Sequence, residues 1–385
     1  MLRICVFTRS TPHHLVGGME IISWNLAKKF VQKGHQVKLI TTSISNRPET
    51  FKEEGIDVVA LAGTPPGKYS KAWGIKSLAY FQTIETDIIF SISAGAYGLL
   101  PYKSDLKIPF IMQLHGTSWS EILAKIKTKD PYSWIKLIKN FYTLPIDIFN
   151  ISKFDALVAV GPRVYDDLHK FPFNLTVNSN KIRIIVNGID NRIFNTTGAD
   201  KISLRDKFRI SKDSKLLMTA CRLHTQKGVD NILNSFSKLL KRRTDVFLIV
   251  AGDGPDKEKL ISLCGKLNLD KRVFFVNSVS QTELGNMLKS SDLFIFLTNR
   301  IEGLPLNILE ALSSGLNCII SEHLDIFESK MIHKINPKDF RKVSEKISYL
   351  LDQGAVAVSS IPENYTLDYS ADQYLQLFES LRSNY

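Results

Sequence analysis

The chain has 385 residues, of which 44% are hydrophobic and 23% charged, and this composition is typical of globular proteins. The length favours two domains over one, because single hydrophobic cores stop growing at about 250–300 residues. The formal net charge of +12 favours anionic partners: nucleic acid, anionic lipid or phosphorylated small molecules. The sequence contains no zinc-finger spacing, RNP signature or basic zipper, and we therefore expect no nucleic-acid partner.

The cysteine pattern and the apolar runs indicate a reducing compartment and no membrane span. The four cysteines lie far apart without a Cys-x-x-Cys pair, which argues against a zinc cage or a disulfide framework. No uninterrupted apolar stretch approaches the about 20 residues that a spanning helix requires. The apolar run at residues 1–8 is too short for a signal peptide and is typical of a buried strand. We expect a cytosolic protein, at most peripheral on the inner face of the cell membrane.

The first half of the chain begins with a β-α-β unit. Residues 3–8 form a β-rich run, a helical segment follows at 19–34, and a second strand at 36–42. This order predicts a parallel sheet with right-handed crossovers. Further strands are expected at 87–92, 109–116, 156–161 and 181–188.

A break at residues 187–203 separates this half from a second α/β half. The segment is rich in Asn, Gly, Thr and Asp with little periodicity, which is typical of an interdomain linker. Open sheets of the doubly wound kind bind ligands beyond the carboxyl ends of their strands. Two such domains facing each other would share a cleft. The strands of the second half are expected at 215–223, 246–255, 272–277 and 292–297, and its helices at 229–242, 256–268, 281–291 and 304–315.

Two glutamates flank the start of the last of these helices. Glu302 lies on the loop after the strand 292–297, Pro305 suits the first helical position, and Glu310 lies on the helix itself. Free backbone N–H groups at a helix start form an anion site. A ligand along this element would have hydroxyls at both ends and phosphates in the middle. The free N–H groups are expected near Gly303, Leu304 and Leu306.

Two cations follow another strand of the same inferred sheet. Arg222 ends the run 215–223, and Lys227 comes five residues later, before Gly228. A guanidinium can bind phosphate oxygens as a planar fork, and an ammonium adds a point charge. A single Arg and Lys after a strand are most often solvated loop charges. Here the cations and the glutamate element share one sheet edge, which favours a phosphate site.

These residues resemble the retaining GT-B glycosyltransferases of the group 1, family 4 type. The matching motifs run in order through Arg222 with Lys227-Gly228, the run 248–255 and the glutamates separated by seven residues. In the first half, the matches are Gly17-Gly18, His115-Gly116 and "VNGID" at 186–190. The resemblance covers nearly the whole chain, and its strength lies in five or six weak motifs in the right order.

The resemblance implies an α/β GT-B architecture of two facing Rossmann-like domains with an interdomain cleft. Residues 1–188 would form the acceptor-binding domain and residues 189–366 the nucleotide-sugar-binding domain. Residues 367–385 would form a C-terminal helix that crosses back to the first domain. The segment after Gly315 lacks the Gly-Gly and the following Glu that are common in the family. Glu328 is the candidate to replace that Glu, and the departure leaves the choice of nucleotide open.

The resemblance also implies a role for each matching residue. Glu302 would bind donor-sugar hydroxyls and Glu310 the ribose diol, while Arg222 and Lys227 would hold the diphosphate and stabilise its charge. Gly17 and Gly18 would bring backbone N–H groups to the phosphate, where a Cβ would obstruct approach. His115 would lie near the donor sugar at the reacting centre. The expected catalytic residues are His115, Arg222, Lys227 and Glu302, and the donor-binding residues are Gly17, Gly18, Arg222, Lys227, Glu302, Gly303, Leu304, Pro305, Leu306 and Glu310.

No metal ion or other cofactor is expected. The sequence lacks any Asp-x-Asp, so cations and a helix N-terminus would stabilise the leaving diphosphate of a UDP- or GDP-linked sugar. A glycosidase with Glu302 and Glu310 as its acid and nucleophile is the rival interpretation. Both carboxylates lie on one loop-helix element, however, and nearby cations are expected to lower the pKa values of both.

Residues 118–145 show a pattern that can bind an anionic membrane surface. An apolar stripe recurs at i, i+3, i+4 and i+7, with lysines before and beside it. Such a basic amphipathic helix can lie in a bilayer interface, at about 1 kcal/mol per lysine. Packing of the stripe into the protein's own core is equally consistent with the periodicity. The stripe is Trp134, Leu137, Ile138 and Phe141, and the lysines are Lys125, Lys127, Lys129, Lys136 and Lys139.

The function expected from these features is transfer of a sugar from a nucleotide diphosphate donor to a lipid-linked glycan acceptor. Surface polysaccharide, lipopolysaccharide or glycolipid assembly is the expected setting. A nucleotide-sugar isomerase or epimerase on the same fold is an alternative, as is an inactive nucleotide-sugar-binding protein.

Overall fold

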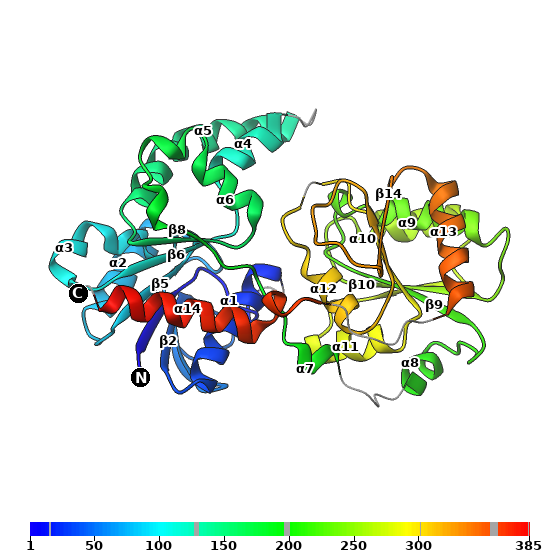
Figure 1. Ribbon diagram of the computed structural model, residues 1–385, viewed down its shortest axis with the longest axis horizontal. Coiled ribbons are helices and arrows are strands. Elements are labelled where there is room, and N and C mark those ends of the chain that lie inside the picture. Colours follow the sequence, from blue (N-terminus) through cyan, green and yellow to red (C-terminus); the bar gives the residue numbers. More distant parts are fainter. Residues whose placement is uncertain (15–16, 127–130, 196–200, 301, 355–360, 384) are drawn as a thin grey trace. The chain divides into compact units, whose positions relative to one another are not determined.

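The computed structural model describes residues 1–14, 17–126, 131–195, 201–300, 302–354, 361–383 and 385 (Figure 1). The chain forms two compact units. The first unit comprises Met1–Gly188 together with Leu367–Tyr385, and the second comprises Ile189–Thr366. The chain passes between the units at two points that lie side by side, because the Ile189 N–H donates to the Tyr365 carbonyl oxygen at 3.0 Å.

The first unit is built on an eight-stranded sheet in the order β3-β4-β2-β1-β5-β6-β7-β8. All pairs are parallel except β3 with β4. Every residue of β5 and β6 is buried, as expected for a parallel sheet that helices cover on both faces. The strands are β1 Arg3–Phe7, β2 Gln36–Thr42, β3 Thr50–Glu53, β4 Ile56–Leu61, β5 Ile88–Ile92, β6 Phe110–Leu114, β7 Ala156–Ala159 and β8 Ile182–Ile184. The helices are α1 Gly18–Gln32, α2 Lys71–Phe81, α3 Lys103–Leu106, α4 Ser118–Ile126, α5 Pro131–Ser152, α6 Pro162–His169 and α14 Leu367–Arg382.

The second unit has a six-stranded, wholly parallel sheet in the order β11-β10-β9-β12-β13-β14. Along β9, Leu216 and Met218 belong to one core cluster and Leu217 to another, so helices cover both faces. The strands are β9 Lys215–Ala220, β10 Val246–Ala251, β11 Val273–Val276, β12 Leu293–Phe296, β13 Cys318–Ser321 and β14 Ile332–Ile335. The helices are α7 Asn191–Phe194, α8 Lys201–Lys207, α9 Val229–Leu239, α10 Lys257–Lys266, α11 Gln281–Lys289, α12 Leu306–Ser313 and α13 Phe340–Gln353. The predicted α/β class with two parallel, Rossmann-like sheets is confirmed.

The last helix, α14, packs against the first unit. The rings of Tyr374 and Phe378 contact Phe30 of α1 and Phe90 of β5. Ion pairs and a hydrogen bond connect the polar face of α14 to α1 and to the residues after β8. They define the position of α14 along its axis and its rotation about that axis. The polar ties are Lys29 with Asp368 at 2.8 Å, Lys33 with Asp372 at 2.6 Å, and Ser370 Oγ to the Val186 carbonyl oxygen at 2.8 Å.

The segment with the membrane-binding pattern is helical where it is described, as α4 and α5, with Pro131 starting the second helix. Among the described residues, no helix is long and apolar enough to pass through a bilayer. All nine side chains of that pattern fall outside the described residues, namely Lys125, Lys127, Lys129, Trp134, Lys136, Leu137, Ile138, Lys139 and Phe141.

The stability of the first unit should depend on the packing of α14. Phe378 is fully buried, so Phe378→Ala should lower the free energy of unfolding of this unit by about 3–5 kcal/mol. Glu379 is the exposed neighbour, and Glu379→Ala should change it by less than about 0.5 kcal/mol. All four tryptophans lie between residues 24 and 134, so tryptophan fluorescence during denaturant unfolding reports on the first unit. Equal midpoints for the two variants would contradict the anchoring role of α14.

Candidate functional site

The strand β12 leads into the loop that carries Glu302, and α12 follows it. Pro305 is extended and caps α12, which begins at Leu306; the prediction that Pro305 occupies the first helical position is therefore wrong by one residue. Helix α12 ends at Ser313, and Gly315 follows with a positive φ of 80°, a conformation that favours glycine at a helix end. Gly303 and Leu304 lie on the loop before the cap.

Lys227 and Glu302 form an ion pair. The Lys227 ammonium donates to Glu302 Oε1 at 2.7 Å and to Oε2 at 2.8 Å. Thr298 Oγ1 also donates to Glu302 Oε1, at 3.2 Å. The two side chains of the ion pair remain 26% and 14% exposed. The structure thus pairs two residues that were predicted to bind different parts of one ligand: Lys227 the diphosphate, and Glu302 the donor sugar.

Hydrogen bonds lock the loops after β9 and β12 together. Asn231 Nδ2 donates to the Leu297 carbonyl oxygen at 3.0 Å and to Asn299 Oδ1 at 3.0 Å. Gly228 has a φ of +67°, and a Cβ there would lie 1.8 Å from the Leu297 oxygen, so only glycine allows this approach. Asn231 is not among the residues predicted from the sequence. Its signal there is a polar residue on the apolar face of α9, where it is completely buried.

Arg222 lies on the loop directly after β9 and is exposed. Within the described ranges it has no acidic partner, so its guanidinium is available to a ligand. Gly252, which follows β10, supports this loop: its φ is +135°, and a Cβ there would lie 2.0 Å from the Cys221 carbonyl oxygen. Asn307 Nδ2 donates to the Ala220 carbonyl oxygen at 2.8 Å, which ties the first turn of α12 to the end of β9.

Glu310 is buried on α12, and burial raises its pKa from the ordinary value near 4.5 to about 7, against the opposing effect of a hydrogen bond with Gln281. The expectation that nearby cations lower the pKa values of both glutamates is therefore wrong for Glu310. Lys227 pairs with Glu302 and leaves Glu310 without a comparable cation among the described contacts. Around pH 7 the ligand-free protein holds this carboxyl in a mixture of its protonated and ionised forms.

Gly17 and Gly18 lie at the start of α1 in the first unit. Gly17 is the extended cap residue, and Gly18 is the first helical residue. A Cβ on Gly17 would lie 2.5 Å from Glu20 Oε2, so the missing side chain first makes room for a carboxylate of the same helix. That carboxylate is buried and accepts a hydrogen bond from Ser10 Oγ at 2.6 Å. The sequence analysis missed Glu20, although an acidic residue in a first helical turn is a recognisable signal.

His115 follows β6 and is partly buried. Its Nε2 lies 2.9 Å from Gln113 Oε1. Burial, and then the nearby Arg9 guanidinium, lower the pKa of His115 to about 4, so its ring is neutral at physiological pH. Arg9, which the sequence analysis missed, lies on the loop after β1 with its guanidinium 5.9 Å from the Tyr69 ring centre.

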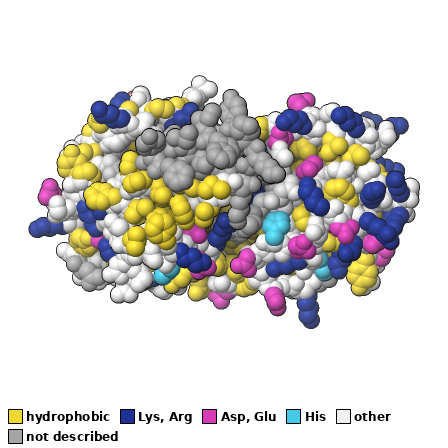
Figure 2. Space-filling model, turned by 90° about the horizontal axis from the view of Figure 1, so that it is seen from above, with side chains coloured by type: hydrophobic (Ala, Val, Ile, Leu, Met, Phe, Trp, Pro, Cys, Tyr) yellow, Lys and Arg dark blue, Asp and Glu magenta, His cyan; other side chains and the backbone are white. Residues whose placement is uncertain are grey.

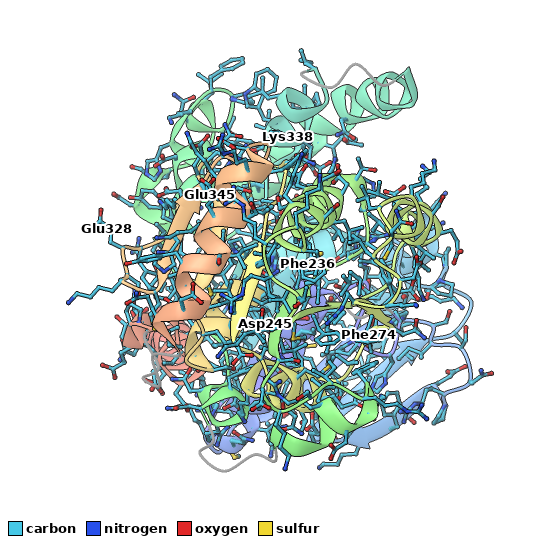
Figure 3. All side chains as sticks on the ribbon, turned by 90° about the vertical axis from the view of Figure 1, so that its right-hand side faces the viewer. Phe236, Asp245, Phe274, Glu328, Lys338 and Glu345 are labelled. Atoms are coloured by element: carbon cyan, nitrogen blue, oxygen red, sulfur yellow. The ribbon has the colours of Figure 1, made fainter. Side chains whose placement is uncertain are left out.

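The predicted site residues therefore form two groups, each at the carboxyl edge of its own sheet. In the second unit, contacts connect the Glu302 loop, α12 and the Lys227 loop, and Arg222 is on the latter. In the first unit, Gly17, Gly18 and His115 follow strands β1 and β6. Glu328, the candidate replacement named above, is exposed on the loop between β13 and β14, and Figure 3 shows its side chain pointing outward.

Two family models match the chain, one to each unit. Residues 16–192 match the model "Glycosyltransferase Family 4", and residues 200–357 match "Glycosyl transferases group 1". Together the two matches include every predicted site residue, from Gly17 to Glu310.

Individual relatives agree with these models. The chain is 26% identical over 320 residues to N-acetyl-alpha-D-glucosaminyl L-malate synthase of Bacillus anthracis, covering 80% of this chain and 77% of the relative. It is also 26% identical over 324 residues to alpha-monoglucosyldiacylglycerol synthase of Streptococcus pneumoniae, covering 82% of this chain and 70% of that one.

Solved structures show the same fold. A glycosyltransferase from Rickettsia africae superposes with a TM-score of 0.75 at 18% identity, covering 100% of this chain and 99% of the other. HepE of Anabaena, in complex with UDP and glucose, also has a TM-score of 0.75, at 14% identity, and covers 99% of this chain and 100% of its own. The GT-B fold expected from the sequence is thereby confirmed. The chain belongs to the group 1, family 4 glycosyltransferases.

Proposed function

We propose that the protein is a retaining, metal-independent glycosyltransferase that moves a sugar from a nucleotide diphosphate donor to a lipid-linked glycan acceptor. The observation that carries the proposal is the Lys227–Glu302 pair, at 2.7 and 2.8 Å, on loops that the Asn231 bonds hold in place. This pair places a cation that can bind phosphate next to a carboxylate that can bind sugar hydroxyls, at one edge of the sheet.

In the proposed complex, Arg222 and Lys227 bind the diphosphate of the donor. An ammonium has three donors, so Lys227 can contact a phosphate oxygen while it remains bonded to Glu302. The backbone N–H groups at the start of α12 add further donors to the leaving diphosphate. Glu302 accepts hydrogen bonds from the sugar hydroxyls, and its charge is already balanced before the donor arrives.

The proposed transfer follows the retaining course that the family resemblance implies. The bond between the sugar C1 and the leaving phosphate oxygen breaks as the acceptor oxygen attacks C1 from the same face. The hydroxyl proton of the acceptor passes to the leaving phosphate, so no protein nucleophile is needed. His115, neutral at physiological pH, takes part as a hydrogen-bond partner of the sugar and not as a cation. We assign Gly17 and Gly18 to the phosphate side of the donor, with the Glu20 charge limiting how near an anion comes.

The nucleotide is proposed to bind with its ribose diol on Glu310. An ionised carboxylate can accept hydrogen bonds from both hydroxyls of a diol. Relatives support a nucleoside diphosphate sugar, since HepE of Anabaena has been solved with UDP-glucose. We propose a UDP- or GDP-linked donor.

The lipid-linked acceptor is supported by apolar side chains exposed in the first unit. Figure 2 shows hydrophobic side chains gathered on the face of this unit that carries α4 and α5. The Lys153 ammonium lies 3.9 Å from the Phe149 ring centre, which places a cation beside the apolar group, as at an interfacial surface. A relative that synthesises a glucosyl diacylglycerol agrees with a lipid acceptor. We propose peripheral binding to an anionic, cytoplasmic leaflet. The exposed side chains are Leu123, Ile126, Ile146 and Phe149.

Replacement of either member of the ion pair should abolish most of the transfer. Hydrogen bonds to charged groups contribute about 1.5–3 kcal/mol, so Lys227→Met and Glu302→Gln should each lower kcat/KM by about 10–100-fold. Nucleotide release from UDP-, GDP- and ADP-sugars, with EDTA present and with or without lipid acceptor, measures this. Lys259→Met, at a mostly exposed lysine of the same unit, is the matched control and should stay within about twofold.

Other outcomes of the same assay distinguish the alternatives. Conversion of the donor to another nucleotide sugar without an acceptor would indicate an isomerase. Tight donor binding without release from any sugar nucleotide would indicate an inactive binding protein. Loss of activity in EDTA that is restored by a divalent cation would contradict metal independence.

Donor affinity should rise with pH through the titration of Glu310. Its pKa of about 7 means that the ionised form, which accepts both diol hydroxyls, becomes dominant only above that pH. From pH 6 to pH 8 the dissociation constant of a nucleotide sugar should fall by about tenfold in all, and most of this fall should occur below pH 7. Calorimetric titration at each pH measures the dissociation constant. A nucleotide sugar is the suitable ligand because its diphosphate diester does not titrate between pH 6 and 8. Glu310→Gln should bind more weakly at pH 8 and show a flat profile; an equally steep profile in this variant would refute the assignment.

The contribution of Glu310 to the stability of the ligand-free protein should fall with rising pH, whereas donor affinity should rise. Because the folded-state pKa of Glu310 exceeds its unfolded value, its favourable contribution is complete below about pH 4.5 and is lost as pH rises through 7. Glu310→Gln should therefore stabilise the ligand-free protein at pH 8 by up to about 3 kcal/mol, and hardly at all at pH 4.5. Thermal unfolding at the two pH values measures the difference.

Membrane binding should depend on the basic and apolar side chains of α4, α5 and the segment between them. Charge reversal of Lys125, Lys127 and Lys136 should release the protein from anionic liposomes, because each lysine contributes about 1 kcal/mol near such a surface. Phe149→Glu should weaken binding further. Charge reversal of Lys241, Lys259 and Lys266 in the second unit gives the same change in net charge and should leave co-sedimentation unchanged. Equal loss in both triple variants would indicate attraction by net charge alone.

A further inference from the structure

Three side chains connect the predicted reacting centre to the last helix of the chain. His115 Nε2 lies 2.9 Å from Gln113 Oε1, and Gln113 Nε2 donates to the Tyr374 hydroxyl at 2.7 Å. Gln113 is 0% exposed and Tyr374 is 1% exposed. Residues 113 and 374 are 261 positions apart in the sequence, and both belong to the first unit. A buried polar chain of this length is costly unless every group is paired, so its geometry is narrowly defined.

The Tyr374 hydroxyl is held in place by the packing of α14. Its ring lies against Phe30 and Phe90, with ring-centre distances of 6.3 and 5.1 Å. The ion pairs from α1 to Asp368 and Asp372 hold the same helix six and two residues before Tyr374. The hydroxyl therefore lies at a fixed point, and the Gln113 amide nitrogen donates to it.

The orientation of that amide decides the tautomer of His115. The two ends of a glutamine amide differ, since the nitrogen donates and the oxygen accepts. With its nitrogen bonded to Tyr374, Gln113 presents its oxygen to His115, and an oxygen acceptor requires the proton on Nε2. Nδ1 then carries a lone pair and can accept a hydrogen bond. Without the Tyr374 hydroxyl, the amide is free to turn and present its NH₂ group to the ring.

We propose that Tyr374 and Gln113 are positioning residues that hold His115 in one orientation and in the Nε2–H tautomer, so that Nδ1 accepts a hydrogen bond from a hydroxyl of a sugar substrate. The proposal rests on the function proposed above, because it takes His115 to contact substrate. Under this proposal, α14 both covers the sheet and positions His115 through Gln113. The ring, neutral at physiological pH, acts as an acceptor and does not transfer a proton.

Nitrogen NMR of histidine-labelled protein tests the tautomer directly, with His115→Gln to assign the signals. The wild type should show a single Nε2–H form of His115. Tyr374→Phe and Gln113→Leu should give mixed or Nδ1–H signals, and Gln113→Glu, which places a carboxylate beside Nε2, should raise the pKa of His115 above the wild-type value of about 4. Ser370→Ala is the matched control, because it removes a hydroxyl from the same helix that bonds the Val186 carbonyl and not Gln113.

Kinetics complete the test. Loss of one neutral hydrogen bond corresponds to a fall of up to about tenfold in kcat for Tyr374→Phe, with the donor KM within about twofold. Ser370→Ala should leave both the spectrum and kcat unchanged. An Nδ1–H form in the wild type, an unchanged His115 spectrum in Tyr374→Phe, or an equal shift in Ser370→Ala would overturn the proposal. If the spectra change as expected while the wild type transfers sugar from no donor, the positioning stands and the proposed function fails.

Discussion

Because β9 and β12 are parallel neighbours, the loops that follow them leave the sheet at the same edge, and Lys227 meets Glu302 there. An ion pair that remains partly exposed contributes at most about 1 kcal/mol, so the pair does not hold the loops together. That task belongs to the buried Asn231 side chain and to the close approach of Gly228 to Leu297. The charged groups thus lie on a support that does not depend on them. In the proposed complex, the donor phosphate would share Lys227 with Glu302 and leave this support unchanged.

Glu310 shows the cost of burying a carboxyl group in a core. Burial of its carboxyl without a cation raises its pKa, and the ligand-free protein is less stable at alkaline pH than an amide at this position would make it. Hydroxyl groups of a bound ligand would replace the water that burial removed. In the proposed complex, stability and ligand recognition would therefore oppose each other at this position.

The first unit reaches its geometry through residues distant in sequence. The missing side chain of Gly17 leaves space for the Glu20 carboxylate, which accepts a hydrogen bond from Ser10. His115 is connected through Gln113 to a tyrosine of the last helix. Covering the β-sheet and orienting a polar ring are therefore done by one element, and damage to α14 would affect both.

The sequence by itself determined the α/β class, the mainly parallel pairing of both sheets, and the position of Arg222, Lys227 and Glu302 on loops that follow strands. These follow from local patterns: β-rich runs alternating with helical periodicity, and charged residues directly after strands. The strands β3, β4, β13 and β14 are not among the predicted elements. Short apolar runs such as those of β4 and β13 do not by themselves distinguish a strand from other buried structure. Only the tertiary structure decided that Lys227 pairs with Glu302, that Glu310 is buried without a cation among the described contacts, that Glu20 occupies the space beside Gly17 and that Gln113 donates to Tyr374. The physical reason is that burial, pKa and hydrogen-bond partners depend on distances between residues far apart in the chain, which periodicity along the chain does not contain.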